Sequence, residues 1–212
     1  MELDGKKLAF LGDSITYGVC LDDLKNSYFN RIIGSYRWSE IHNHSLKGSR
    51  IGYFIGQENL GTSFVDRYPQ MPDNMDVVIV FGGTNDFGIC NDPIGTPQDN
   101  TPHTFYGALN VLIKGLKNKN PGAYIIFLTP LHRRNENTPN QYTGALFIEY
   151  IQAIRDRARV HEIHLVDLYE AESLQPTEGY YETLIYHDGI HPTDACHKLI
   201  AEEVIKYLNA IS

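Results

Sequence analysis

The chain has 212 residues, 42% of them hydrophobic, and a formal net charge of −8 at pH 7. This length and apolar content suffice for one well-packed core, so we expect a single domain over residues 1–212. The acidic balance argues against nucleic acid as a partner, because binding to a phosphate backbone depends on concentrated positive charge. It favours a neutral or moderately polar small molecule.

Short apolar runs bounded by turn residues alternate along the chain with segments of helical period. The predicted strands are Lys7–Leu11, Glu40–His44, Val77–Phe81, Tyr124–Leu128 and His164–Asp167. The predicted helices are Ser27–Tyr36, Thr104–Lys117, Thr143–Arg159 and Thr193–Leu208. This alternation predicts an α/β fold, a three-layer α/β/α sandwich around a five-stranded parallel sheet. In such a sheet, ligands bind beyond the carboxyl ends of the strands, so cooperating residues are expected just after strands.

The stretch from Phe87 to Pro102, with three prolines and two glycines, is predicted to be the longest irregular insertion. Loops of this length are often functional or mobile.

A candidate nucleophile, Ser14, lies three residues after the first predicted strand. A serine hydroxyl is a weak nucleophile and needs a base within hydrogen-bond reach, which is itself oriented by a third group. Near the C-terminus, Asp188 precedes His191 by three residues in a turn set by Gly189. This spacing lets the carboxylate contact one imidazole nitrogen while the other nitrogen faces the serine.

Acyl transfer also needs hydrogen-bond donors for the oxyanion of the tetrahedral intermediate. Asn85, which follows the strand Val77–Phe81, offers a side-chain amide. Gly48, which follows the second strand, offers a backbone N–H that no side chain obstructs. The backbone N–H of Ser14 is the third candidate.

Four blocks resemble those of the SGNH hydrolases, also called the GDSL lipase/esterase family, and occur in the family's order. They are GDSITYG at 12–18, NHSLKGSR at 43–50, GGTND at 82–86 and DGIHP at 188–192. The resemblance implies a flavodoxin-like fold and ester hydrolysis without metal or other cofactor. It implies Ser14 as nucleophile, His191 as base and Asp188 as its orienting partner. It also implies an oxyanion hole of Ser14, Gly48 and Asn85, with Gly48 on the loosest of the four matches.

Other side chains are candidates for substrate binding because they follow strands or flank the blocks. They are Asp13, Tyr17, Asp86, Phe87, His132, Arg133 and Tyr186. Arg133 and Arg134 suit an anionic substrate group, but a solvated basic loop explains them equally well. Asp13 is more simply read as a brace for its own turn, and Asp86 stays ambiguous between an Asx turn and a site role.

A metal site is the competing interpretation. His187 and His191 would need a helix to face one metal, and Gly189 and Pro192 disfavour one there. His42 and His44 share a strand face but lack a third ligand nearby in sequence. The three cysteines form no CxxC pair, so we expect reduced thiols and neither a disulfide framework nor a thiolate zinc site.

We therefore predict a metal-independent serine esterase that acts on short-chain or carbohydrate O-acyl esters. Lysophospholipid or thioester hydrolysis is the alternative within the class, and a non-catalytic binding protein on the same scaffold is the alternative outside it. The N-terminal apolar run is too short for a signal peptide and no later segment approaches a membrane span, so a cytoplasmic location without membrane insertion is expected.

Overall fold

The computed structural model describes residues 3–56 and 61–211, in which five parallel strands form one sheet of order β2-β1-β3-β4-β5. The strands are β1 (Lys7–Gly12), β2 (Glu40–Ser45), β3 (Val77–Phe81), β4 (Tyr124–Leu128) and β5 (His164–Val166). The chain runs from β1 to one edge and then crosses back to β3, so the strand order reverses between β1 and β3. Residues that follow β1 and β3 are therefore placed where open α/β sheets bind ligands.

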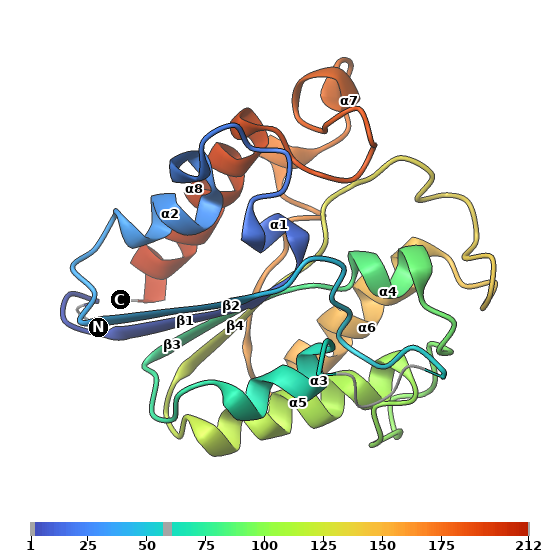
Figure 1. The fold of residues 1–212 in the computed structure, drawn as a ribbon, viewed down its shortest axis with the longest axis horizontal. Helices are drawn as coiled ribbons and strands as arrows, with labels where there is room; N and C mark the ends of the chain where they lie inside the picture. Colours follow the sequence, from blue (N-terminus) through green and yellow to red (C-terminus); the bar gives the residue numbers. More distant parts are fainter. Residues whose placement is uncertain (1–2, 57–60, 212) are drawn as a thin grey trace.

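Helices cover both faces of the sheet (Figure 1). The α-helices are α1 (Ser14–Tyr17), α2 (Tyr28–Ile33), α3 (Phe64–Arg67), α4 (Thr84–Ile89), α5 (Phe105–Lys119), α6 (Phe147–Val160), α7 (Tyr180–Thr183) and α8 (Asp194–Ile211). Short 3-10 helices are η1 (Leu24–Asn26), η2 (Tyr68–Gln70) and η3 (Glu172–Leu174). Helices α2 and α8 lie on one face, and α3, α5 and α6 lie on the other (Figure 1). The predicted three-layer fold is confirmed.

The core has two halves, one on each face of the sheet. Val78 and Val80 of β3 pack with α5 and α6, while Val77, Ile79 and Phe81 pack with α2 and α8. Every residue of β3 is buried, which explains why this strand is apolar without alternation.

Two predicted helices are shorter than expected at one end. The helix predicted from Ser27 ends at Ile33, and Ser27 itself is the N-cap, whose hydroxyl accepts a hydrogen bond from the Asn30 N–H. The helix predicted from Thr143 begins at Phe147, because Gly144 adopts a left-handed conformation with φ of 72° in a turn before it.

The irregular stretch after β3 is also shorter than predicted. Phe87 belongs to α4, so the loop starts at Cys90 and ends before α5. The stretch 129–146, between β4 and α6, is longer than this loop, a difference that the sequence pattern did not predict. None of the described helices is long and apolar enough to cross a membrane.

Candidate active site

The turn from β1 into α1 fixes the position of Ser14. A Cβ at Gly12 would lie 2.0 Å from the Thr16 hydroxyl oxygen, so only glycine allows this close approach of strand and helix. Asp13 caps α1 by accepting a hydrogen bond of 2.9 Å from the Ile15 N–H. Ser14, the first residue of α1, lies at the carboxyl edge of the sheet and is 7% exposed.

The segment 185–192 forms a closed loop that presents His191. Its ends pair through an isolated bridge between Ile185 and Pro192. Gly189 has a φ of 78°, and its position against Arg134 leaves no room for a Cβ. The Asp188 Oδ1 accepts hydrogen bonds from the backbone N–H groups of Ile190 at 2.9 Å and His191 at 3.0 Å. The aspartate therefore holds the turn that carries the histidine.

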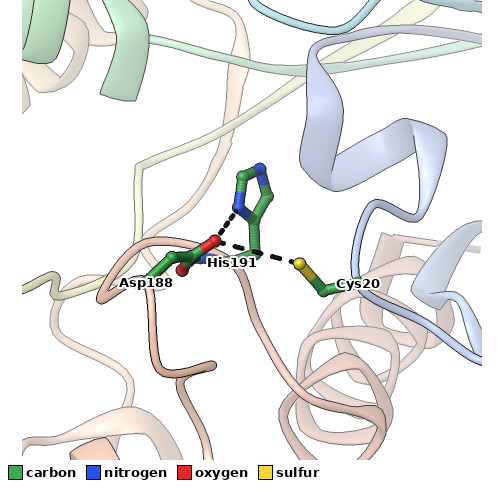
Figure 2. Close-up of side chains that lie close together, drawn as sticks. All are labelled: Cys20, Asp188 and His191. Carbon is green, nitrogen blue, oxygen red and sulfur yellow. Dashed lines mark hydrogen bonds and ion pairs between the residues drawn. The ribbon is translucent and has the colours of Figure 1, made fainter.

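Ser14, His191 and Asp188 form one hydrogen-bonded chain across the full length of the sequence. The Ser14 Oγ lies 2.8 Å from His191 Nε2, and His191 Nδ1 lies 2.6 Å from Asp188 Oδ2 (Figure 2 shows the latter pair). Partial burial opposes ionisation of Asp188, but the hydrogen bonds donated by His191 and Ile190 outweigh it and lower the pKa of this carboxyl. An ionised carboxylate accepts from Nδ1–H and leaves Nε2 as the acceptor for the serine proton.

Asn85 and Gly48 lie at the same edge of the sheet. The Asn85 Nδ2 donates to the Ser49 backbone oxygen at 2.9 Å and lies 3.5 Å from Asp13 Oδ2. Gly48 precedes this carbonyl, is exposed, and adopts a φ of 70° with open space around its Cα. The left-handed backbone, not crowding, is what favours glycine at position 48.

Two buried carboxylates lie behind these groups. Burial raises the pKa of Asp13 to about 7, against the opposing hydrogen bond from Ile15. Burial also raises the pKa of Asp86 to about 6, against hydrogen bonds from the Ile51 and Gly52 backbone N–H groups. Asp86 thus holds the segment after Gly48 in place, and Asp13 caps its own turn.

The remaining predicted substrate-binding residues divide into exposed and packed side chains. Tyr17 is 47% exposed, with the Lys47 ammonium 4.4 Å from its ring centroid, and Tyr186 is 37% exposed. Phe87 is 5% exposed and packs against Phe147 and Tyr150.

The side chains of His132 and Arg133, which follow β4, make packing and hydrogen-bond contacts within the protein. His132 is 6% exposed, and its ring bonds Glu136 and the Tyr169 backbone oxygen. The Arg133 guanidinium donates to the Thr84 backbone and side-chain oxygens. These contacts hold Arg133 against the start of α4 and His132 against Tyr169.

Cys20 is a neighbour of the triad that the sequence pattern did not indicate. Its Sγ lies 3.8 Å from Asp188 Oδ2 (Figure 2). No sequence motif indicates this contact, since Cys20 lies outside any recognised thiol motif and 168 positions from Asp188.

Comparison with known proteins identifies the family of this chain. The model of the GDSL-like lipase/acylhydrolase family matches residues 10–199, a range that contains all four blocks and the triad. The chain belongs to this family.

Proteins of known structure share the fold along nearly the whole chain. A protein from Lactobacillus plantarum is 25% identical, with a TM-score of 0.82 over 98% of each chain. A lipase/acylhydrolase from Enterococcus faecalis is 18% identical, with a TM-score of 0.64 over 97% of this chain and 96% of that one. No match was found among the curated proteins.

A carbohydrate esterase is also among the similar structures. The family 2 carbohydrate esterase from Corynascus thermopiles, which carries a carbohydrate-binding domain, is 17% identical. Its TM-score is 0.62 over 97% of this chain and 66% of that one. Family membership makes this chain a GDSL-like hydrolase.

Proposed function

We propose that this GDSL-like hydrolase is a serine esterase that works through an acyl-enzyme on Ser14, without a metal. The observation that carries the proposal is the hydrogen-bonded chain from Ser14 Oγ through His191 to Asp188. It supplies a nucleophile, a base and an orienting carboxylate, with the base within hydrogen-bond distance of both of the others.

In the acylation half-reaction, Ser14 Oγ attacks the ester carbonyl carbon and its proton passes to His191 Nε2. Asp188 stabilises the imidazolium that forms. Collapse of the tetrahedral intermediate breaks the bond to the alcohol oxygen, and the alcohol leaves with the proton from His191. In deacylation, His191 takes a proton from water, the hydroxide attacks the acyl carbon, and the acid leaves as Ser14 regains its proton.

The oxyanion would be held by the backbone N–H groups of Ser14 and Gly48 and by Asn85. The Asn85 amide has two N–H bonds, and the one directed at the Ser49 carbonyl fixes its orientation. The other N–H has only the long contact of 3.5 Å to Asp13, so it is the donor free to bind an oxyanion. Burial of Asp13 disfavours its ionised form, which limits negative charge beside the intermediate.

Short acyl esters on a carbohydrate are the substrates that the site favours. Exposed aromatic and polar side chains border it, including Tyr17, Lys47 and Tyr186, and aromatic faces of this kind suit sugar rings. The fold similarity to a carbohydrate esterase agrees with this choice.

The mechanism is tested with Ser14→Ala, assayed on an activated acetyl ester and with a fluorophosphonate probe. We expect kcat/KM to fall about 10⁴-fold or more and the probe to label only the wild-type protein. Ser35→Ala, at an exposed serine just after the end of α2, is the matched control and should keep both properties. A folded Ser14→Ala protein with full activity would disprove the mechanism, and loss of activity on exhaustive chelation would disprove metal independence.

The substrate class is tested with a panel of acetylated oligosaccharides, octanoyl esters, lysophospholipids and acyl-thioesters. We expect the highest kcat/KM on the acetylated sugars. A rate that rises with acyl length would instead assign the lipase or thioesterase alternative, while leaving the Ser14 mechanism intact.

A further inference from the structure

Three different metal-ligating side chains meet on the side of the triad away from Ser14. The Cys20 Sγ, one Asp188 oxygen and one imidazole nitrogen of His191 all lie within 4.8 Å of one another. Cys20 comes from the segment after α1, while Asp188 and His191 come from the loop before α8, and the Asp188 carboxylate contacts both the thiol and the imidazole (Figure 2). A thiolate, a carboxylate and an imidazole form a donor set typical of Zn²⁺.

The backbone at Cys20 is unusual for a cysteine. Its φ is 73°, in the left-handed region that non-glycine residues seldom occupy. This turn follows the left-handed Gly18 and carries the sulfur toward Asp188. Cys20 is partly exposed, whereas Cys90 and Cys196 are buried, so it is the cysteine that a dissolved ion reaches most readily.

We propose that Cys20, Asp188 and His191 bind a thiophilic divalent cation, such as Zn²⁺ or Cd²⁺, and that its binding switches the triad off. The switch rests on the proposed role of His191 as base, but the ion site itself does not. In a four-coordinate zinc site the fourth ligand would be water.

The distances require movements of up to roughly 1 to 1.5 Å, the largest for Cys20 and His191, whose ligand atoms lie within 4.8 Å of each other. Zinc bonds of about 2.0 to 2.3 Å place tetrahedral ligands about 3.3 to 3.6 Å apart. The Cys20 Sγ and Asp188 Oδ2 are already 3.8 Å apart, so this pair needs little change. His191 Nδ1 and Asp188 Oδ2, at 2.6 Å, must separate by somewhat less than about 1 Å. Rotation of the exposed Asp188 side chain provides this movement.

Binding of the ion inhibits hydrolysis because it changes which nitrogen of His191 carries the proton. The ion takes the Nδ1 lone pair, so the single proton of neutral His191 moves from Nδ1 to Nε2. Nε2–H then donates to Ser14 Oγ and cannot accept the serine proton. The Cys20 thiol releases its proton to solvent, and the thiolate and carboxylate together balance the two positive charges of the ion.

The thiol makes the site selective for soft divalent cations over hard ones. Sulfur is a soft donor that binds Zn²⁺ and Cd²⁺ strongly. A hard cation such as Mg²⁺ gains little from sulfur and prefers an all-oxygen shell. We therefore expect Zn²⁺ and Cd²⁺ to bind and Mg²⁺ not to bind.

The site is tested first without any activity measurement. Cadmium is titrated into the Ser14→Ala protein while the ultraviolet thiolate-to-cadmium charge-transfer band is followed. We expect a saturable band with one equivalent of Cd²⁺, absent in the double variants with Cys20→Ser or Cys20→Gly. Glycine suits the left-handed backbone, so Cys20→Gly keeps the fold in case serine does not. Absence of the band in Ser14→Ala, or its persistence without Cys20, would overturn the site.

Inhibition is tested next in the active protein. We expect Zn²⁺ to inhibit hydrolysis of an activated acetyl ester, a chelator to restore it, and Mg²⁺ to have no effect. Cys20→Gly should raise the half-inhibitory Zn²⁺ concentration at least about tenfold, since even outer-shell changes weaken metal sites 10–100-fold. Equal inhibition of both proteins would refute the switch. A wild-type protein without esterase activity would refute the proposed function while the cadmium band still decides the ion site.

Discussion

Asp188 organises the site through both of its carboxylate oxygens. One oxygen accepts the Ile190 and His191 backbone N–H groups, and the other accepts the His191 imidazole. The backbone bonds fix the loop, and the imidazole bond fixes the tautomer. Removal of the charge alone should therefore separate the electrostatic role of Asp188 from its structural role.

The variant that makes this separation is Asp188→Asn. An amide keeps one acceptor for the loop, but it can present N–H to Nδ1 and favour the wrong imidazole tautomer. We expect kcat to fall about 10⁴-fold with little change in the melting temperature. Asp194→Asn is the matched control, because this exposed carboxylate bonds Asn26 instead of the triad. A loss of less than tenfold would show that Asp188 does not orient the base.

The sequence located these residues because each follows a predicted strand or lies in a short turn with recognisable chemistry. Ser14, Asn85, Asp188 and His191 are of this kind. Position after a strand did not predict the contacts of His132 and Arg133. Their side chains bond the backbone oxygens of Tyr169 and Thr84. The contact of Cys20 with Asp188 could not be predicted in this way, since it depends on a left-handed φ angle that a cysteine in the sequence does not indicate.

Arg67, the last residue of α3, ties three segments together at the carboxyl edge of the sheet. Its guanidinium donates to the backbone oxygens of Gly12 and His44, at the ends of β1 and β2, and to the Ser49 hydroxyl. Burial lowers the pKa of Arg67 to about 10, which leaves it charged at neutral pH. The segment that carries Gly48 is thus held to the strands through one side chain.

Replacing Arg67 with methionine should loosen this edge. Methionine fills much of the volume but leaves buried carbonyl oxygens without donors, at about 1–3 kcal/mol for each group. We expect the free energy of unfolding, measured in urea, to fall by at least about 2 kcal/mol. Esterase activity should fall as well, because Gly48 and Ser49 lose their support.

Arg37→Met is the control for this element. Arg37 is exposed and pairs with Asp4 at the surface, where such pairs contribute about 0–1 kcal/mol. If both variants lost the same stability, the edge would not depend on Arg67.

Sequence patterns predicted the long elements well and the short ones poorly. The strands match to within one residue, because apolar runs between turn residues are what a two-sided sheet requires. The one-turn helices α1, α3 and α7 have too few residues for a periodic pattern. Their positions come from caps and tertiary contacts such as those of Asp13 and Arg67.

At the scale of the whole molecule, buried titratable groups have opposite effects on the stability of the fold as the pH falls. The pKa values of Asp13 and Asp86 are raised, so between pH 4 and 7 the folded protein binds more protons at these sites than the unfolded chain does. Through these two groups, stability rises as the pH falls. His197 acts in the other direction, and the stability of the wild-type protein alone does not separate the two effects.

His197 joins α8 to α2 in the half of the core opposite α5. It is fully buried, and its Nδ1 accepts the Tyr28 backbone N–H at 3.2 Å. Its Nε2 has no hydrogen-bond partner among residues 3–56 and 61–211. Burial lowers the pKa of His197 from 6.5 to about 3, so between these values the unfolded chain binds a proton that the folded protein does not. The stability that the neutral imidazole contributes is therefore complete above pH 6.5 and is lost as the pH falls toward 3.

The corresponding variant is His197→Gln, whose side-chain oxygen can accept from the Tyr28 N–H without titrating. At pH 7 we expect the wild-type protein to be more stable, because the larger ring fills the core better. Between pH 6.5 and 4 the wild-type advantage should shrink by on the order of a few kcal/mol, since only the wild-type unfolded chain gains a proton at this position. Urea unfolding of both proteins across this range measures the difference, in which the contributions of Asp13 and Asp86 cancel. An NMR titration of the His197 imidazole gives the independent check: a ring that becomes protonated near pH 6.5 in the folded protein, or a constant stability difference, would contradict the prediction.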